Sequence, residues 1–269
     1  MGLTRAQAVV GACAIPLVFV LPFYVIPGSL NRRRNDVSTV FFRVAVSCTT
    51  TLLVTAAVHA SPARCGLPVA AWLGLSASAA TLAVPAALVA GLYAGTIARI
   101  AAGRASVPYR DTASHLAVRN LLFAPVIEEL VFRACICRVL LSGGFTPGAA
   151  IALGPVFFAV AHMHHIIEAV VFQKTALKTA LKTQSFQMLY TVLFGTIAEL
   201  VFVVTGSLAA AIVLHAGCNY FGVPRLRAAG PSGRKFIATS WAGFAAAGAV
   251  VLWLARQPHA LAECDEDVR

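Results

Sequence analysis

The sequence predicts an all-α, polytopic integral membrane protein with about eight transmembrane helices around an intramembrane cavity. Of its 269 residues 59% are hydrophobic and only 12% are charged, and the mean hydropathy is +0.82, which is more apolar surface than one soluble core can bury. Most of the apolar stretches approach the ~20 residues that cross ~30 Å of hydrocarbon. They lie at about residues 7–28, 38–60, 68–98, 116–141, 147–171, 185–205, 208–223 and 237–255, of which 208–223 is the shortest.

Basic residues gather in every second loop between these stretches. Lys and Arg outnumber Asp and Glu by 21 to 10, a balance that in a soluble protein would indicate nucleic-acid binding. Here their loop positions indicate topology instead, because cytoplasmic loops are enriched in Lys and Arg. We therefore expect a lipid bilayer and no nucleic acid as partner, with these residues in cytoplasmic loops: Arg32, Arg33, Arg34, Arg99, Arg104, Arg110, Lys174, Lys178, Lys182, Arg225, Arg227, Arg234 and Lys235. The opposite side holds only Arg5, Arg64, Arg256 and Arg269.

The N-terminal stretch and the cysteines add two expectations. The stretch at 7–28 lacks a clear cleavage site before Arg32, so it is expected to be a retained span rather than a signal peptide. The seven cysteines include no Cys-x-x-Cys pair and lie mostly inside apolar stretches. They predict neither a disulfide framework nor a thiolate zinc site, and we expect them to be small apolar filler.

The chain divides by its chemistry within a single structural domain. Residues 1–110 form a three-span apolar scaffold with no acidic residue inside any span. Residues 111–225 form the predicted catalytic membrane core, because polar and ionisable residues appear there within the apolar stretches. Residues 226–269 hold the last span and an acidic tail.

The first polar cluster is Glu128, Glu129 and Arg133, roughly 18 Å along its span at 1.5 Å per residue. Each ionisable residue near mid-membrane costs ~2.5–3.5 kcal/mol, so the three need compensation or a water-filled cavity. Glu129 and Arg133 are four residues apart and can neutralise each other. Glu128 lies ~100° further round the helix, so it is expected to face a cavity.

The second cluster has Phe158 one turn before His162, followed by His164, His165 and Glu168 towards the cytoplasmic end. His162 lies deepest and is a candidate site residue. Adjacent histidines at a membrane interface are commonly solvated, and we expect this of His164 and His165. His165 and Glu168, three residues apart, leave open a shared metal or proton.

The third cluster places His215 and Asn219 four residues apart, on one side of a helix. Both side chains can donate hydrogen bonds to a developing oxyanion. Cys218 raises the alternative of a thiol nucleophile activated by imidazole. A thiol buried in an apolar span is inert, however, which disfavours that alternative.

Together the clusters read Glu-Glu-x-x-x-Arg, Phe-x-x-x-His and His-x-x-x-Asn, in order and on separate spans. This pattern resembles the CAAX protease and bacteriocin-processing superfamily of membrane proteins. Residues 119–135, 161–168 and 215–224 are similar to its eukaryotic branch, the type II CAAX prenyl proteases, also called Ras-converting CAAX endopeptidases. About 100 residues carry the resemblance, and the first three spans add only hydropathy.

The resemblance implies an endopeptidase that removes the aaX tripeptide from prenylated CAAX proteins, such as small GTPases, at the endoplasmic reticulum membrane. The active site would open to the cytoplasm. Glu128 with His162 would activate a water, and His215 with Asn219 would hold the carbonyl oxygen of the intermediate. Glu129, Arg133 and Phe158 would support them, and no cofactor or metal is expected.

Two alternatives stay open on the sequence. The same residues could hold zinc in a metallopeptidase, although His-Glu-x-x-His is absent. A non-catalytic proton-coupled transporter or scaffold could also use intramembrane carboxylates and histidines, although no inverted repeat is found. Glu199 fits no motif and is expected to be paired or cavity-lining. The sequence pattern does not distinguish farnesyl from geranylgeranyl substrates, and it predicts neither the individual substrates nor the oligomeric state.

Overall fold

The computed structural model describes residues 2–26, 35–107, 113–225 and 233–261. The predicted all-α class is confirmed, because every regular element in these ranges is helical. Some predicted features lie outside the described residues, namely Arg32, Arg33, Arg34, Arg110, Arg227 and the acidic tail from 262 onward.

The helices follow the predicted apolar stretches. The N-terminal elements are α1 (Arg5–Val20), α2 (Pro22–Val25), α3 (Val37–Ala60), the 3₁₀ turn η1 (Pro62–Arg64), α4 (Val69–Leu73), α5 (Ala79–Leu92) and α6 (Ala94–Ala101). One continuous helical run holds α7 (Ser114–Val118), η2 (Arg119–Phe123), α8 (Ala124–Glu129), η3 (Leu130–Cys137) and α9 (Arg138–Ser142). The remainder is α10 (Pro147–Ala161), α11 (His164–Ile167), η4 (Glu168–Phe172), α12 (Leu177–Thr205), α13 (Leu208–Phe221) and α14 (Gly233–Leu254).

Five helical segments of the described chain are long and apolar enough to cross a membrane, and a sixth counts if the bent α5 and α6 pair is one span. The five are Arg5–Val25, Val37–Ala60, Pro147–Phe172, Leu177–Thr205 and Gly233–Leu254. The other two predicted spans are also helical, but each fails the criterion of length and apolarity for its own reason. The run from α7 to α9 is long but carries several charged residues, and α13 is apolar but has only 14 residues.

The predicted third span, 68–98, is not one straight helix. It contains α4 followed by α5 and α6, which meet at a 78° bend. The bend lies at Tyr93, whose hydroxyl donates a hydrogen bond of 2.6 Å to the carbonyl of Gly222. Its ring also stacks on Phe221, with ring centroids 4.7 Å apart. The bend is therefore held against the end of α13.

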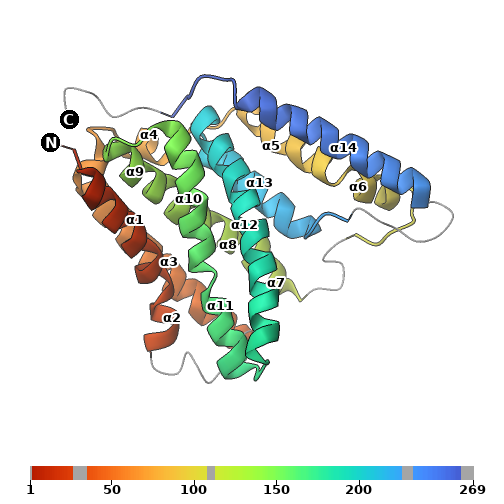
Figure 1. Cartoon of the computed structure of the whole chain (residues 1–269), viewed down its shortest axis with the longest axis horizontal. Coiled ribbons are helices and arrows are strands. Elements are labelled where there is room, and N and C mark those ends of the chain that lie inside the picture. The colour runs from red at the N-terminus through yellow and green to blue at the C-terminus, as the bar shows by residue number, and fades with distance from the viewer. Residues whose placement is uncertain (1, 27–34, 108–112, 226–232, 262–269) are drawn as a thin grey trace.

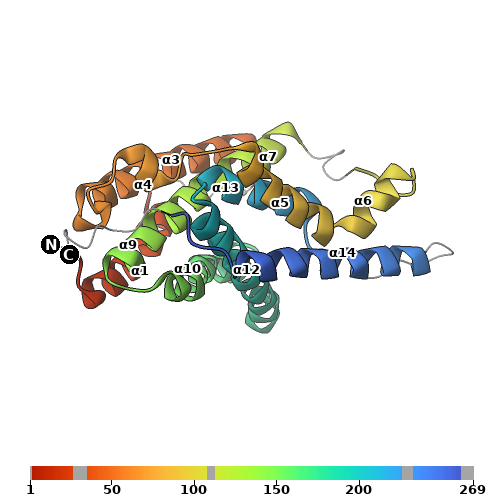
Figure 2. The same cartoon turned by 90° about the horizontal axis from the view of Figure 1, so that it is seen from above.

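The helices pack around two hydrophobic clusters, and Figures 1 and 2 show α14 running alongside α5 and α6. The larger cluster joins α1, α3, the run from α8 to α9 and α10, and it includes Ile127, Phe132 and Phe158. The smaller cluster joins α5, α12, α13 and α14 through residues such as Leu88, Leu214 and Leu254. Since α12 and α13 supply residues to both clusters, they join the two halves of the molecule.

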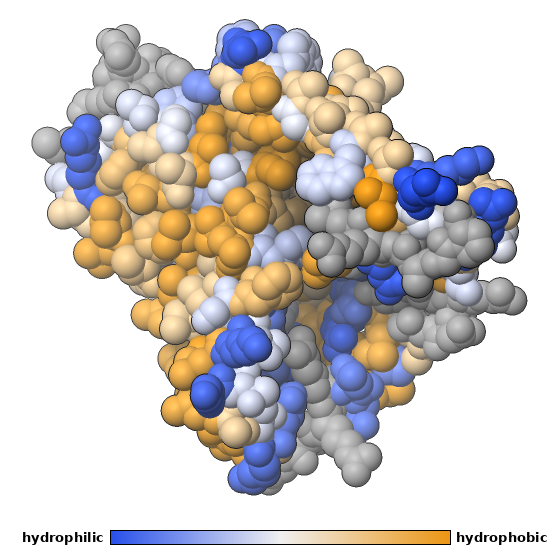
Figure 3. Space-filling model, turned by 45° about the vertical axis from the view of Figure 1, so that its right-hand side comes forward, coloured by the Kyte–Doolittle hydropathy of each residue, from blue (hydrophilic) through white to orange (hydrophobic). Residues whose placement is uncertain are grey.

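The outer surface is suited to lipid. Large apolar side chains stay exposed along the spans, among them Val10, Leu17 and Leu52. Figure 3 shows broad hydrophobic areas on one face, with hydrophilic residues gathered chiefly below them and at the right. A contiguous apolar surface of this kind indicates burial in a bilayer rather than exposure to water.

Two residues outside the predicted site show how the scaffold is fastened. Arg138 is fully buried, and its guanidinium donates to the carbonyls of Trp72 and Ala71 at 3.1 and 3.0 Å. These carbonyls belong to the last turn of α4, where intrahelical donors are lacking. Cys65 is disulfide-bonded, so the expectation that the cysteines are only filler is wrong for this residue.

Candidate active site

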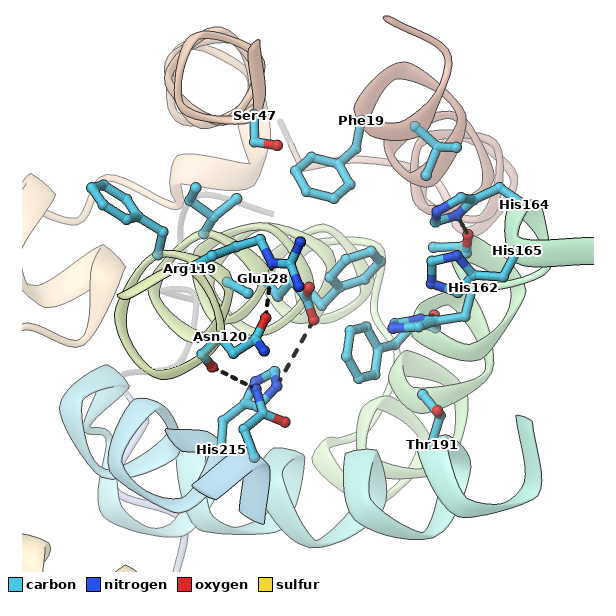
Figure 4. Close-up of a pocket in the computed structure, with 18 of the residues that line it drawn as sticks. Phe19, Ser47, Arg119, Asn120, Glu128, His162, His164, His165, Thr191 and His215 are labelled. Carbon is cyan, nitrogen blue, oxygen red and sulfur yellow. Dashed lines mark hydrogen bonds and ion pairs between the residues drawn. The ribbon is translucent and has the colours of Figure 1, made fainter. Parts of the chain in front are cut away.

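A cavity of about 390 Å³ lies between the helices, and the three polar clusters meet in it (Figure 4). Its walls come from α1, α2, α3, the run from η2 to η3, α10, α11, α12 and α13. Five of the seven predicted site residues line it, namely Glu128, Phe158, His162, His215 and Asn219. Glu129 and Arg133 are buried behind it.

Two π-helical segments border the cavity. They are η2 and η3, which supply the cavity-lining residues Arg119, Asn120 and Phe132. A π-helical turn adds a residue to the ordinary turn and changes which side chains share a face, and such turns are frequent at functional sites. The wide turns therefore help to aim polar groups inward from a single continuous helix.

Glu129 and Arg133 form the ion pair that their spacing predicts. Arg133 Nε lies 3.0 Å from Glu129 Oε2. The same nitrogen lies 3.6 Å from Glu199 Oε2, on α12, which identifies the partner of the residue that fitted no motif. The guanidinium also lies over the ring of Phe158, 4.6 Å from its centroid. One buried cation thus joins η3, α8, α10 and α12, with two carboxylates and an aromatic face around it.

His215 lies between the two neighbouring glutamates. Its Nδ1 donates a hydrogen bond of 2.7 Å to Glu129 Oε1, which accepts it as a carboxylate. Its Nε2 lies 3.9 Å from Glu128 Oε2, a separation too long for a direct hydrogen bond and suited to a bridging water. Glu129 therefore fixes the ring so that Nε2 faces Glu128, as the carboxylate of a catalytic triad orients its histidine.

His162 reaches the same space from α10. Its Nδ1 donates to the carbonyl of Phe158 at 2.8 Å, because a carbonyl can only accept. The hydrogen bond places the proton of a neutral ring on Nδ1 and leaves Nε2 as an acceptor. In Figure 4 the rings of His162 and His215 both point toward the space beside Glu128.

Asn219 is tied to the helix that carries Glu128. Its Nδ2 donates to the backbone carbonyl of Asn120 at 2.9 Å. The side-chain oxygen of Asn120 in turn accepts a hydrogen bond of 2.8 Å from Arg119 Nε. The amide nitrogen of Asn219 carries two hydrogens, so one N–H can serve as this anchor and the other can be offered to a ligand.

A second group of titratable residues lies beside the cavity, on α11 and η4. His165 Nδ1 lies 3.2 Å from Glu168 Oε2, as their spacing suggested. Glu168 Oε1 accepts a hydrogen bond of 2.7 Å from Arg43 Nη1, on α3. Glu168 is buried, and this pairing with a cation from a distant span supplies a reason for its position that the sequence did not reveal.

The arrangement of possible metal ligands differs from the one that the zinc alternative needs. Within the described parts of the chain, one group of three brings its ligand atoms within 4.8 Å of one another, and it consists of His164, His165 and Glu168. Glu128, His162 and His215, the ligands proposed for zinc, are not gathered in this way. These three residues line one cavity.

Several residues at the cavity were missed as site residues on the sequence. Arg43 and Ser47 come from the apolar scaffold, and Arg119 and Asn120 precede the first motif by two turns or more. Arg119 belongs to a stretch that resembles the type II CAAX prenyl proteases, but its residue type alone gave it no role. The signal that could have found Arg43 and Arg119 was their charge, since an arginine inside an apolar stretch is costly unless it faces protein or water.

Comparison with known proteins bears on the same segment. Residues 111–221 match the family described as Type II CAAX prenyl endopeptidase Rce1-like. The resemblance to type II CAAX prenyl endopeptidases is confirmed. CAAX prenyl protease 2 of Arabidopsis thaliana is 43% identical over 120 residues, which cover 44% of this chain and 39% of the relative. The human protein of that name is 40% identical over 112 residues, covering 42% and 34%. The Saccharomyces cerevisiae protein is 34% identical over 123 residues, covering 43% and 38%.

The similarity to CAAX prenyl endopeptidases is confined to the part of the chain that carries the polar clusters. The matched stretch spans about a third to two fifths of the length of these relatives. It contains every predicted site residue and also Glu199, whereas Arg43, Ser47 and Phe19 lie outside it. No solved structure matches the chain significantly.

Proposed function

We propose that this chain is an intramembrane endopeptidase that removes the C-terminal aaX tripeptide from prenylated CAAX proteins. One observation carries the proposal: Glu128, His162, His215 and Asn219, from three separate helices, line a single cavity with His215 held between two glutamates. The similarity of residues 111–221 to CAAX prenyl proteases adds the substrate class.

The chemistry begins with a water held near Glu128 and His162. The Glu128 carboxylate takes a proton from this water as the oxygen attacks the scissile carbonyl carbon, and His162 Nε2 accepts the water's other hydrogen and orients it. Glu128, His162 and His215 line the cavity in which such a water would lie. The carbon–oxygen bond forms, and the negative charge moves to the former carbonyl oxygen.

The oxyanion is stabilised from the opposite side. With both ring nitrogens carrying a proton, His215 donates from Nε2 to the oxyanion and from Nδ1 to Glu129. Asn219 donates its second N–H. When the intermediate collapses, the carbon–nitrogen bond breaks, and the proton held by Glu128 passes to the leaving amine of the tripeptide. The prenylated cysteine then carries the new carboxyl group, which becomes a carboxylate when its remaining proton leaves to solvent.

A bilayer location suits this reaction. An isoprenoid on the substrate contributes ~0.8 kcal/mol per buried CH₂-sized group, far more apolar area than the tripeptide itself offers. We infer that the substrate, such as a small GTPase, approaches at the cytoplasmic face of the endoplasmic reticulum. The basic loops favour that orientation, and the disulfide-bonded Cys65 lies in a loop on the opposite, oxidising side.

The test is a purified preparation in detergent with a farnesylated Cys-a-a-X peptide, followed by mass spectrometry of the released tripeptide. We expect the tripeptide to appear, and to appear at least tenfold more slowly from the same peptide without the farnesyl group. Glu128→Gln is the matched negative control, because it keeps the shape of the side chain and removes the base. No release from the farnesylated peptide by the folded wild-type protein would contradict the proposal.

Orientation is tested separately by inserting a glycosylation acceptor in microsomal expression. An acceptor beside Lys174 is expected to stay unmodified, and one beside Cys65, in the loop before α4, is expected to be glycosylated. The reverse pattern would show that the cavity opens to the lumen.

A further inference from the structure

Tyr93, at the bend between α5 and α6, is tied to the last turn of α13. Its side chain is buried, with 2% of its surface exposed. Its hydroxyl donates to the carbonyl of Gly222 at 2.6 Å and lies 3.4 Å from the carbonyl of Cys218. Its ring stacks on Phe221 at an interplanar angle of 21°. One buried side chain thus contacts both the backbone and a side chain at the end of α13.

That last turn carries Asn219, the proposed oxyanion donor. α13 ends at Phe221, and Gly222 follows with a φ of +70°, a conformation that residues with a Cβ rarely adopt. The chain therefore leaves the helix two residues after Asn219, and no further turn of α13 supports this residue. Helix ends fray unless other contacts hold them. Tyr93 supplies such a contact.

α5 meets α13 again one turn earlier (Figure 2). A Cβ added to Gly217 would lie 2.7 Å from Val89 Cγ2, so the two helices touch where α13 has no side chain. Gly217 precedes Asn219 by two residues, which turns the helix by about 200°. The face of α13 that packs on α5 is therefore opposite to the one that carries Asn219 into the cavity.

The backbone and the side chain of Asn219 are thus held by different partners. Its Nδ2 donates to the carbonyl of Asn120 at 2.9 Å, which orients the amide. Tyr93 holds the backbone from the other side of α13. An oxyanion donor has to lie about 2.7–3.1 Å from the developing charge, and a misplacement of about 1 Å can cost roughly 10²-fold in rate. A contact behind α13 therefore bears on the reaction.

A second route from Tyr93 to the cavity passes through α12. Tyr190, which lines the cavity, lies beside the same hydroxyl. An effect of Tyr93 on the reaction through Tyr190 would be independent of Asn219, whereas an effect through the end of α13 would require Asn219. The two routes are therefore separable by experiment.

We propose that Tyr93 is a positioning residue that holds Asn219 in place for the oxyanion through the last turn of α13. This inference rests on the proposed function. It assigns a part in the reaction to a residue that lies outside the three motifs and outside residues 111–221, the segment shared with the family.

The experiment is a double-mutant cycle of Tyr93→Phe and Asn219→Ala on the farnesylated peptide. Tyr93→Phe keeps the stacked ring and removes the hydroxyl. We expect it to lower kcat by about 10- to 100-fold, with KM little changed, because the oxyanion develops only after the substrate has bound. In the Asn219→Ala protein the same change should lower kcat by less than about twofold, since coupled residues are not additive.

Tyr24→Phe is the matched control, because the Tyr24 hydroxyl also donates to a backbone carbonyl, that of His164 at 3.2 Å. Whatever its effect on kcat, that effect should be the same with and without Asn219. Thermal unfolding in detergent verifies that every variant is folded.

A second pair of variants tests the same support without changing Tyr93. Gly217→Ala is expected to push α13 away from Val89 and to lower kcat with little change in KM. Adding Val89→Ala removes the colliding methyl groups and should restore most of the rate. Restoration by a second truncation indicates that the position of α13 sets the rate.

Two results would overturn the inference while leaving the proposed function intact. One is a folded Tyr93→Phe protein with wild-type kcat. The other is a fall in kcat of equal size with and without Asn219, which would assign the effect to stability or to Tyr190. Absence of cleavage by wild-type protein contradicts the proposed function, and this inference with it.

Discussion

Glu129 Oε1 lies 2.7 Å from His215 Nδ1, while the other oxygen of the same carboxylate lies 3.0 Å from Arg133 Nε. One buried side chain thus orients the imidazole that faces Glu128 and neutralises the arginine behind it. The two motifs that carry these residues are 86 positions apart, and this contact brings them together.

Replacing Glu129 with glutamine distinguishes its role as a hydrogen-bond acceptor for His215 from its role as a negative charge. Glu129→Gln keeps an oxygen that can accept from His215 Nδ1 but removes the negative charge beside the ring and beside Arg133. We expect kcat for the farnesylated peptide to fall by about 10²–10³, comparable to the loss of an oxyanion donor, with KM little changed. Steady-state kinetics on the purified variant measure this, and a KM effect with normal kcat would place Glu129 in substrate binding instead.

The four predicted catalytic residues should act on one transition state. Glu128→Ala, His162→Ala and His215→Ala are each expected to abolish tripeptide release, and combining two of them should add little. Asn219→Ala should cost ~10²–10³ in rate. Helical content by circular dichroism checks that the variants are folded, and near-normal turnover in any of the first three would remove that residue from the mechanism.

Cys218→Ser distinguishes the water mechanism from a thiol nucleophile. Cys218 is buried and lines the cavity beside Asn219, so its position alone does not exclude it. We expect the serine variant to retain substantial activity, because serine conserves the volume and no covalent step is required of the thiol. Complete loss of activity, together with trapping of wild-type protein by a thiol reagent, would restore the thiol mechanism.

Whether the protein needs zinc is tested by measuring its metal content and its activity together. We expect protein purified with a tight chelator to release tripeptide at an undiminished rate, and elemental analysis to find less than one zinc per chain. The opposite pair of results, one zinc per chain and activity that disappears and returns with it, would establish a metallopeptidase.

Glu199 should contribute to stability through Arg133. Glu199→Leu leaves the buried guanidinium with one carboxylate instead of two, and we expect about 1–3 kcal/mol of destabilisation, the cost of an impaired buried polar contact. Glu199→Gln, which keeps an acceptor, should cost less. Thermal unfolding in detergent measures both, with Lys182→Gln on the exposed part of the same helix as control. Equal stability of Glu199→Leu and wild-type protein would show the contact to be energetically neutral.

The sequence predicted the parts that follow from local spacing. The pair Glu129 and Arg133 lies one turn apart on one helix, and its ion pair needs no knowledge of the rest of the fold. The prediction that Glu128 faces a cavity followed from the same helix geometry, because Glu128 points away from the Glu129–Arg133 pair. Partners from distant helices could not be predicted, because spacing along one helix says nothing about which helix packs against it. Glu199 with Arg133, and Arg43 with Glu168, are of this kind.

The bend at Tyr93 was missed for another reason. Pro85 is the residue in that stretch that would normally indicate a break, yet α5 continues through it. The bend occurs eight residues later, where Tyr93 contacts Phe221 and Gly222. A tertiary contact decides where the helix bends. Hydropathy carries no information on such contacts, so it predicts one uninterrupted span.

The walls that Phe19, Phe23 and Arg43 supply to the cavity belong to α1, α2 and α3, which precede the segment shared with the relatives. The cavity is therefore lined partly by the segment shared with the relatives and partly by helices outside it. On the proposed function, substitutions in the first three helices would change the shape of the cavity while Glu128, His162 and His215 stay in place. A chimera that exchanges residues 1–60 between two homologues is the natural way to transplant selectivity.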